Sequence, residues 1–244
     1  MHASLRNLDH RPWPIPRTGW TWRQSWLDLL FAHWPIDASS LRPLIPREVT
    51  LQEFDGSAWI GVVPFRMSGV MRRPFPDLPW VSAFPELNVR TYVELDGKPG
   101  VWFLSLDATN PLAVWAARRF FHLPYFRAAI TLRRDGEEIR YESRRGEAAF
   151  TGTYAPTSPV RLRAKGSLEH WLTERYCLYA RDPRGRVLRN DVHHAPWPLQ
   201  DARADIRSNS MLAPHGLRLP DTAPLLHFAE SVDVVVWNAE VVRG

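Results

Sequence analysis

Four polar side chains alternate with apolar ones between residues 84 and 95, in a segment whose pattern predicts a β-strand. Because successive side chains of a strand leave opposite faces, one face would carry Glu86, Asn88, Arg90 and Tyr92. An acid, an amide and a guanidinium around one small ligand could bind an organic anion and transfer a proton. If this face points to solvent, it is an ordinary hydrated strand. The sequence leaves both interpretations open.

Two arginines and one histidine are further candidates for ligand binding. Arg118 and Arg119 lie near the end of a helix predicted over 110–121, where the helix dipole favours cations. We predict that one of them points into the mouth of a cavity and binds a substrate carboxylate through both guanidinium nitrogens. His193 shares a strand face with Asp191, which could orient its imidazole toward a ligand. A hydrogen-bonded structural histidine is the commoner interpretation.

The familiar cofactor and nucleophile motifs are missing from the sequence. The adjacent His193 and His194 leave opposite faces of a strand, so they cannot hold one metal together. We find no glycine-rich phosphate loop and no serine elbow. Cys177, the single cysteine, lies among apolar residues, which is typical of a packed thiol and not of a reactive one. We therefore predict no metal and no cofactor.

Length, composition and charge narrow the class of protein. A chain of 244 residues suits one large β domain or two small ones, and one cysteine excludes an internal disulfide. No apolar run matches a signal peptide or the roughly 20 residues that cross a bilayer, so we predict a cytoplasmic protein with no membrane partner. The net charge is +5, but the arginines are interspersed with acidic residues. Because phosphate binding needs clustered cations, we predict no nucleic-acid partner.

Turn signals and helix caps divide the chain into many strands and few helices. Helices are predicted after the caps Asp37, Asn110 and Ser167, and a hairpin is predicted at Asp55-Gly56. Strands are predicted over residues 22–34, 59–67, 84–95, 101–107, 176–180, 187–194 and 231–242. One further strand is predicted to end at Phe54, two more lie on the two sides of Asp135-Gly136, and another ends at Tyr154.

The predicted elements indicate one domain of the mainly β (α+β) class. Hairpins dominate, so an antiparallel sheet is expected, and closure into a large β-barrel with a central cavity is the simplest way to remove its exposed edges. Two or three short helices would flank it. Residues 1–19 contain three prolines and are predicted to form an extended arm, with the domain over 20–244.

Several segments together resemble a family of uncharacterised bacterial proteins called YqjF-like. This resemblance covers nearly the whole chain after residue 20 and brings a fold without an activity. It rests on the segments LLFAHWPIDASSLRPLIP, FDGSAWIGVVPFRMSGV, SAFPELNVRTYV, NPLAVWAARRFFHLPY, GSLEHWLTERYCLYA and HHAPWPLQ.

The order of features also resembles, more distantly, acetoacetate decarboxylase, through LRPLIP, FPEL, LDATNPLAV and MLAPHGLRLP. The resemblance implies that fold, and it implies that Glu86 of FPEL corresponds to an active-site carboxylate. The family's Schiff-base lysine would fall near Arg118 and Arg119, but no lysine lies between Lys98 and Lys165. A guanidinium stays protonated and cannot replace the amine nucleophile, so Schiff-base decarboxylation is not expected.

Three functions remain open at the level of sequence. The leading hypothesis is a protein, either a monomer or a homo-oligomer, whose cavity binds a small carboxylate- or carbonyl-containing organic molecule. The second is a lyase- or hydrolase-type enzyme that uses Glu86 as general acid or base. The third is a structural or protein-interaction module with an aromatic surface that includes Trp80. An open cavity that reaches Glu86 would favour the first two, and a filled barrel would favour the third.

Overall fold

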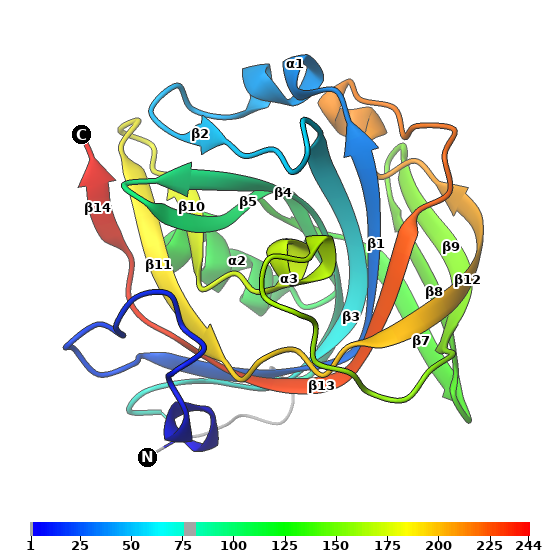
Figure 1. The fold of residues 1–244 in the computed structure, drawn as a ribbon, viewed down its shortest axis with the longest axis horizontal. Helices are drawn as coiled ribbons and strands as arrows, with labels where there is room; N and C mark the ends of the chain where they lie inside the picture. Colours follow the sequence, from blue (N-terminus) through cyan, green and yellow to red (C-terminus); the bar gives the residue numbers. More distant parts are fainter. Residues whose placement is uncertain (1, 76–81) are drawn as a thin grey trace.

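A computed structural model describes residues 2–75 and 82–244 of the chain. Within these residues fourteen strands join one mixed sheet. Seven strands close into a ring, because one of them, β11, pairs with both β10 and β13 (Figure 1). In their order around the ring, the strands are β11 (Val187–His194), β10 (Cys177–Arg181), β5 (Lys98–Ala108), β4 (Phe84–Leu95), β3 (Ala58–Arg72), β1 (Trp22–Ile36) and β13 (Leu225–Val236).

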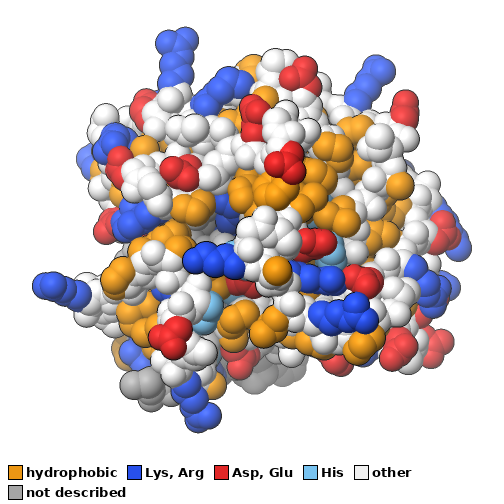
Figure 2. Space-filling view, in the orientation of Figure 1, with side chains coloured by type: hydrophobic (Ala, Val, Ile, Leu, Met, Phe, Trp, Pro, Cys, Tyr) orange, Lys and Arg blue, Asp and Glu red, His pale blue; other side chains and the backbone are white. Residues whose placement is uncertain are grey.

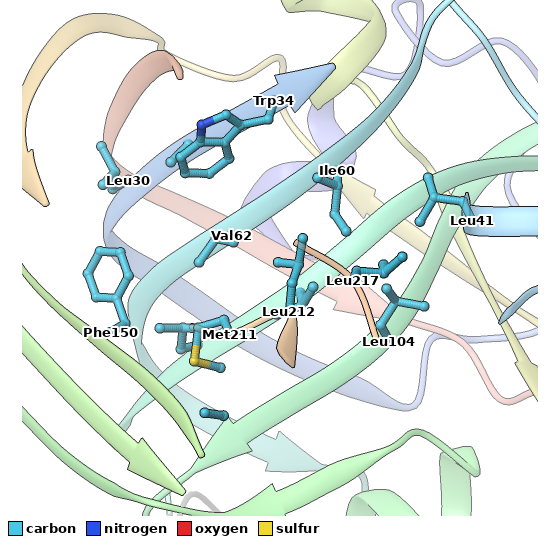
Figure 3. Close-up of a cluster of buried hydrophobic side chains, with 14 of the residues drawn as sticks. Leu30, Trp34, Leu41, Ile60, Val62, Leu104, Phe150, Met211, Leu212 and Leu217 are labelled. Carbon is cyan, nitrogen blue, oxygen red and sulfur yellow. The ribbon is translucent and has the colours of Figure 1, made fainter. Parts of the chain in front are cut away.

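Four further strands continue the sheet away from the ring and stand beside it in Figure 1. Following on from β13, they are β12 (Gln200–Asn209), β9 (Ala148–Pro156), β8 (Glu138–Arg145) and β7 (Ala129–Asp135). A hydrophobic cluster fills the space between this extension and the ring. Figure 3 shows Val62 and Leu104 of the ring in the same cluster as Phe150 of β9 and Met211. The apolar faces on both sides of the ring are therefore buried.

The helices follow the predicted caps. The Asp37 side chain accepts a hydrogen bond at the start of α1 (Ala38–Leu41), the Asn110 side chain at the start of α2 (Pro111–Phe121), and that of Ser167 at the start of α3 (Leu168–Thr173). Figure 1 looks along the ring and shows α3 across its near opening, with α2 further back. The 3₁₀ turns are η1 (Ala3–Arg6), η2 (Arg42–Leu44) and η3 (Ala213–His215).

Two features of the pairing differ from the prediction. The ring is not wholly antiparallel, because β5 pairs in parallel with β10 and with the short β6 (Tyr125–Arg127). The hairpin expected at Asp55-Gly56 is reduced to one bridge between Phe54 and Ser57, and β2 (Thr50–Leu51) pairs with β4 instead. The last predicted strand is two elements, β13 and the edge strand β14 (Glu240–Arg243).

The N-terminal segment packs against the ring more closely than an extended arm would. Ser4 and Arg11 are buried, and the guanidinium of Arg11 forms an ion pair with Asp191 of β11. The carbonyl oxygen of Ser4 is 2.8 Å from the imidazole of His193. The ion pair between Arg11 and Asp191 and the contact between Ser4 and His193 attach this proline-rich segment to β11.

The fold class is confirmed: the protein is mostly β, with a large mixed sheet that closes as a seven-stranded ring and short helices. None of the helices described is long and apolar enough to cross a membrane. On the face drawn in Figure 2, basic side chains are spread out with acidic ones among them.

Candidate functional site

Strand β4 places three polar side chains inside the ring. Glu86, Asn88 and Arg90 all line one cavity of about 390 Å³, so the polar face of this strand points inward. All three are buried. Opposite Arg90, β3 carries Gly61, where a Cβ would come within 2.9 Å of the His33 ring. The glycine leaves room for the imidazole beside the polar trio.

Glu86 is a carboxyl group held in an apolar enclosure. It is 1% exposed, and the Tyr125 hydroxyl donates a hydrogen bond of 2.8 Å to its Oε2. Burial raises the pKa of Glu86 to about 8; the Tyr125 hydrogen bond opposes this shift and the nearby Asp107 adds to it. Near pH 7 the carboxyl is therefore mostly protonated. It can act as an acid at that pH, and as a base once it ionises.

Tyr125 stays a hydrogen-bond donor across the same pH range. Burial and the neighbouring Glu86 raise the pKa of its phenol well above the ordinary value. The tyrosine is held by β6, which pairs in parallel with β5 through the register Leu106 to Tyr125. The partner of Glu86 thus comes from a segment 39 residues away in the sequence.

Arg90 is a buried cation without an acidic partner. Among the residues described, no carboxylate lies within ion-pair distance of it, whereas the buried Arg11 and Arg189 both have one. Its Nη2 donates to the Leu172 carbonyl at 3.3 Å, and the guanidinium lies 5.2 Å from the centre of the Phe31 ring. Its Nε has no hydrogen-bond partner in the described part of the chain.

Asn88 adds a second unsatisfied group to the same wall. Its Oδ1 is buried and, within residues 2–75 and 82–244, accepts no hydrogen bond. Buried polar atoms are nearly always hydrogen-bonded in proteins. Two such atoms on neighbouring inward positions of one strand indicate that a ligand or ordered water completes the site.

Most of the remaining cavity wall is apolar and runs outward to α2; Gln24 and Arg72 are the polar exceptions in its described lining. Trp26, Phe65, Phe84, Phe103, Phe121 and Trp197 supply aromatic surface around the polar end. Leu112 and Trp115, on the first turns of α2, line the cavity and are 60% and 61% exposed, so they form its mouth. The cavity thus has a polar buried end and an apolar opening.

The two helix arginines lie elsewhere. Arg118 and Arg119 are exposed, and neither is among the described residues that line the cavity. The Nε of Arg118 donates a 2.6 Å hydrogen bond to the Tyr125 carbonyl, which turns the side chain away from the mouth. Arg119 lies against Phe120. Their predicted role at the mouth gains no support from this placement.

His193 also lies outside the cavity. Its Nε2 faces the N-terminal segment and contacts the Ser4 carbonyl at 2.8 Å, and burial lowers its pKa to about 4. Asp191 does not orient it, because that carboxylate accepts hydrogen bonds from Arg11 and from Trp13. The structural interpretation of this histidine fits its contacts better than a role in ligand binding.

Sequence reasoning missed two members of the site. Tyr125 follows the proline that ends α2, and no spacing in the sequence connects it with Glu86. His33 is buried beside Arg90, and its Nε2 lies 2.6 Å from the Tyr92 hydroxyl. Its sequence neighbours, Ala32 and Trp34, gave no sign of this position. Trp80 lies outside the described residues.

Neither Lys98 nor Lys165 is among the described residues that line the cavity. In the described ranges no group of three histidine, cysteine or acidic side chains could hold a metal ion. The open space reaches Glu86, which is the arrangement that favours a ligand-binding cavity or an enzyme over a filled interaction module.

Comparison with known proteins gives one family and one fold. A family model, DUF2071, described as an uncharacterized conserved protein, matches residues 23–233. The uncharacterized protein YqjF of Bacillus subtilis is 47% identical over 226 residues, which are 91% of this chain and 93% of that protein.

Solved structures of the same fold are enzymes with distant sequences. The enduracididine biosynthesis enzyme MppR, complexed with the condensation product of pyruvate and imidazole 4-carboxaldehyde, has a TM-score of 0.70 at 12% identity, covering 93% of this chain and 90% of its own. Acetoacetate decarboxylase from Legionella pneumophila has a TM-score of 0.65 at 14% identity, covering 99% and 98%. An acetoacetate decarboxylase-like enzyme from Sphingomonas wittichii scores 0.63 at 14% identity, covering 93% and 94%.

Proposed function

Because this chain belongs to the DUF2071 family of uncharacterised conserved proteins, which brings no activity with it, we propose from the site that the cavity binds a small organic carboxylate. The observation that carries this proposal is Arg90, a buried guanidinium that lines the cavity and has no acidic partner in the described part of the chain. A guanidinium is always protonated, and an unpaired charge in a protein interior is strongly unfavourable. A ligand carboxylate would supply the missing partner.

The neighbouring groups suit a carbonyl oxygen next to that carboxylate. Glu86 is neutral at pH 7, so it does not repel an anion, and its proton can be donated to a ligand oxygen. The Oδ1 of Asn88 needs a donor, such as a ligand hydroxyl or a bridging water. MppR has also been solved with pyruvate, a carboxylate beside a carbonyl, which supports a 2-oxo acid as the first probe.

The test is the binding of 2-oxobutanoate by calorimetry to wild type, Arg90→Met and Arg118→Met. We expect Arg90→Met to weaken binding at least tenfold, because Arg90 is the one buried cation in the described cavity lining, Arg72 being partly exposed. Arg118→Met removes an exposed arginine outside the cavity and is expected to bind like wild type. Equal binding by wild type and Arg90→Met would refute the proposal, and a loss confined to Arg118→Met would move the anion site to the helix.

One observation favours catalysis as a second candidate: a carboxyl whose pKa of about 8 lies near ordinary working pH. Ionised Glu86 could remove a proton from the carbon next to the ligand carbonyl. The C–H electron pair then forms an enolate, whose charge Arg90 would stabilise. A lyase- or hydrolase-type reaction could start from this step.

Deuterium exchange tests this candidate. In D₂O, wild type should exchange the C3 protons of 2-oxobutanoate faster as pH rises through about 8, where Glu86 ionises. Glu86→Gln keeps the size of the side chain but cannot accept the proton, so the exchange should fall to the uncatalysed rate. Exchange by Glu86→Gln at the wild-type rate would leave binding as the only proposed activity.

A further inference from the structure

The cavity is much larger than a three-carbon acid needs. Its volume is about 390 Å³, and at roughly 30 Å³ for each water-sized group this equals about a dozen non-hydrogen atoms. A short 2-oxo acid has about half that number. The remaining space lies between the polar end and α2, and its walls are aromatic and aliphatic.

The buried polar groups lie at one end of this space. Glu86, Asn88 and Arg90 lie at the buried end, while Leu112 and Trp115 lie at the exposed mouth. Gln24 and Arg72 are further polar lining residues, and the guanidinium of Arg72 lies 5.8 Å from the centre of the Phe120 ring of α2. An acid bound at Arg90 therefore has a mostly apolar path toward α2. Hydration of a polar tail would be lost on this path without compensating hydrogen bonds, whereas an apolar tail would bury its surface favourably.

Small side chains on α2 keep the path open. Ala113, Ala116 and Ala117 line the cavity from one side of the helix, and the much larger Trp115 stands at its rim. Bulky side chains at the three alanine positions would fill the space between the helix and the strands. The helix thus provides a wall that leaves room for a hydrocarbon chain.

Resting on the function proposed above, we infer that the natural ligand is an amphipathic monocarboxylic acid of about eight to ten carbons. Its carboxylate binds Arg90 and its hydrocarbon or aryl tail runs along the aromatic wall to Trp115. The anion provides orientation and the tail provides most of the affinity.

A chain-length series tests this inference. Butanoate, hexanoate, octanoate and decanoate are titrated against the protein, with the fluorescence of the cavity tryptophans Trp22, Trp26 and Trp197 as the readout. Each buried methylene is expected to tighten binding about fourfold, so octanoate, with four more methylenes, should bind roughly 250-fold tighter than butanoate. The gain should level off once the tail reaches the mouth.

Three variants separate the cavity from other apolar surfaces. Arg90→Met should weaken every acid in the series, which excludes adventitious binding of the tail alone. Trp115→Ser should weaken decanoate several-fold and weaken butanoate much less. Leu162→Ser removes a similarly exposed apolar side chain that is not among the described lining residues and should change neither.

The outcomes distinguish this inference from the function beneath it. If butanoate binds in an Arg90-dependent manner but octanoate binds no tighter, the tail inference is wrong and the carboxylate site stands. If no acid binds in an Arg90-dependent manner, both are wrong. If Trp115→Ser and Leu162→Ser weaken decanoate equally, the tail does not leave through this mouth, and the inference fails.

Discussion

Glu86→Gln should make the protein more stable near neutral pH. The carboxyl is buried in the ring, and its pKa is raised from 4.5 to about 8 in the folded state. At pH 7 the unfolded chain has this group ionised and hydrated, while the folded protein must keep it protonated. Glutamine is neutral in both states and has nearly the same shape. It can also accept the hydrogen bond from Tyr125 through its amide oxygen.

The size of the effect follows from proton linkage. Because the folded-state pKa is raised, the carboxyl binds more protons in the folded than in the unfolded chain, and stability falls as pH rises from 4.5 toward 8. Each pH unit in this window is worth about 1.4 kcal/mol. The free energy of unfolding of wild type is then lower than that of Glu86→Gln by less than about 1 kcal/mol at pH 5 and by about 3 kcal/mol at pH 7. The difference becomes constant above about pH 8.5.

Urea unfolding of wild type and Glu86→Gln at pH 5, 7 and 8.5 measures this difference. At pH 7 the variant should be more stable by about 3 kcal/mol, or roughly 6 to 12 °C in Tm for a chain of this size. Glu147→Gln changes an exposed glutamate and should show no such dependence. A difference between wild type and Glu86→Gln that stays the same from pH 5 to 8.5 would refute the assigned burial and pKa of Glu86.

Three further predictions concern the ring and the N-terminal segment. Gly100→Ala should destabilise the protein by about 1–3 kcal/mol in urea, because a Cβ there would lie 2.8 Å from the Cys177 carbonyl oxygen across the β5–β10 pair; wild-type stability would contradict that parallel pairing. Arg11→Met should cost about 3 kcal/mol, since it removes one of the two arginines that pair with the buried Asp191 and leaves only Arg189, and an unchanged urea midpoint would mean that the N-terminal segment is not docked. Burial raises the pKa of the Cys177 thiol to about 12, so it should resist a thiol reagent at pH 8 until guanidinium unfolds the chain; rapid labelling of the native protein would contradict its burial.

Local signals in the sequence predicted the elements that position the site. The alternation from 84 to 95 identified β4 and the shared face of Glu86, Asn88 and Arg90, and the Asn110-Pro111 pair identified the start of α2. These signals work because helix caps and strand alternation depend on residues within a few positions of each other. The face of β4 that points inward is decided by the closure of the ring. That closure pairs strands that are distant in sequence, so no local pattern predicts it.

The errors lie where pairing is non-local or the apolar residues are small. Strand β12 was not predicted, although Ala202, Ala204 and Ile206 alternate with charged residues, because alanine gives a weak strand signal. The parallel pair of β5 and β6 was also unpredictable, and with it the contact between Tyr125 and Glu86. The sequence thus placed the three polar residues on one strand face but left open whether that face lines a cavity, and it did not indicate the Tyr125 hydroxyl.

Glu86 and Arg90 are best explained together. Both groups lower the folding stability of the ligand-free protein, and both are suited to a bound carboxylate. One is a carboxyl forced to keep its proton, and the other is a cation without an acidic partner among the described residues, four residues along the same strand. Apolar residues of similar size would give a more stable ring, since the surrounding wall is already apolar. A bound carboxylate would neutralise Arg90, and its negative charge would hold Glu86 protonated to still higher pH.

Binding of the anion should therefore weaken as pH rises past about 8, where Glu86 in the free protein ionises and begins to repel it. Glu86→Gln should bind the same acid with little pH dependence, because its side chain stays neutral; an equal pH dependence in both proteins would assign the titration to another group.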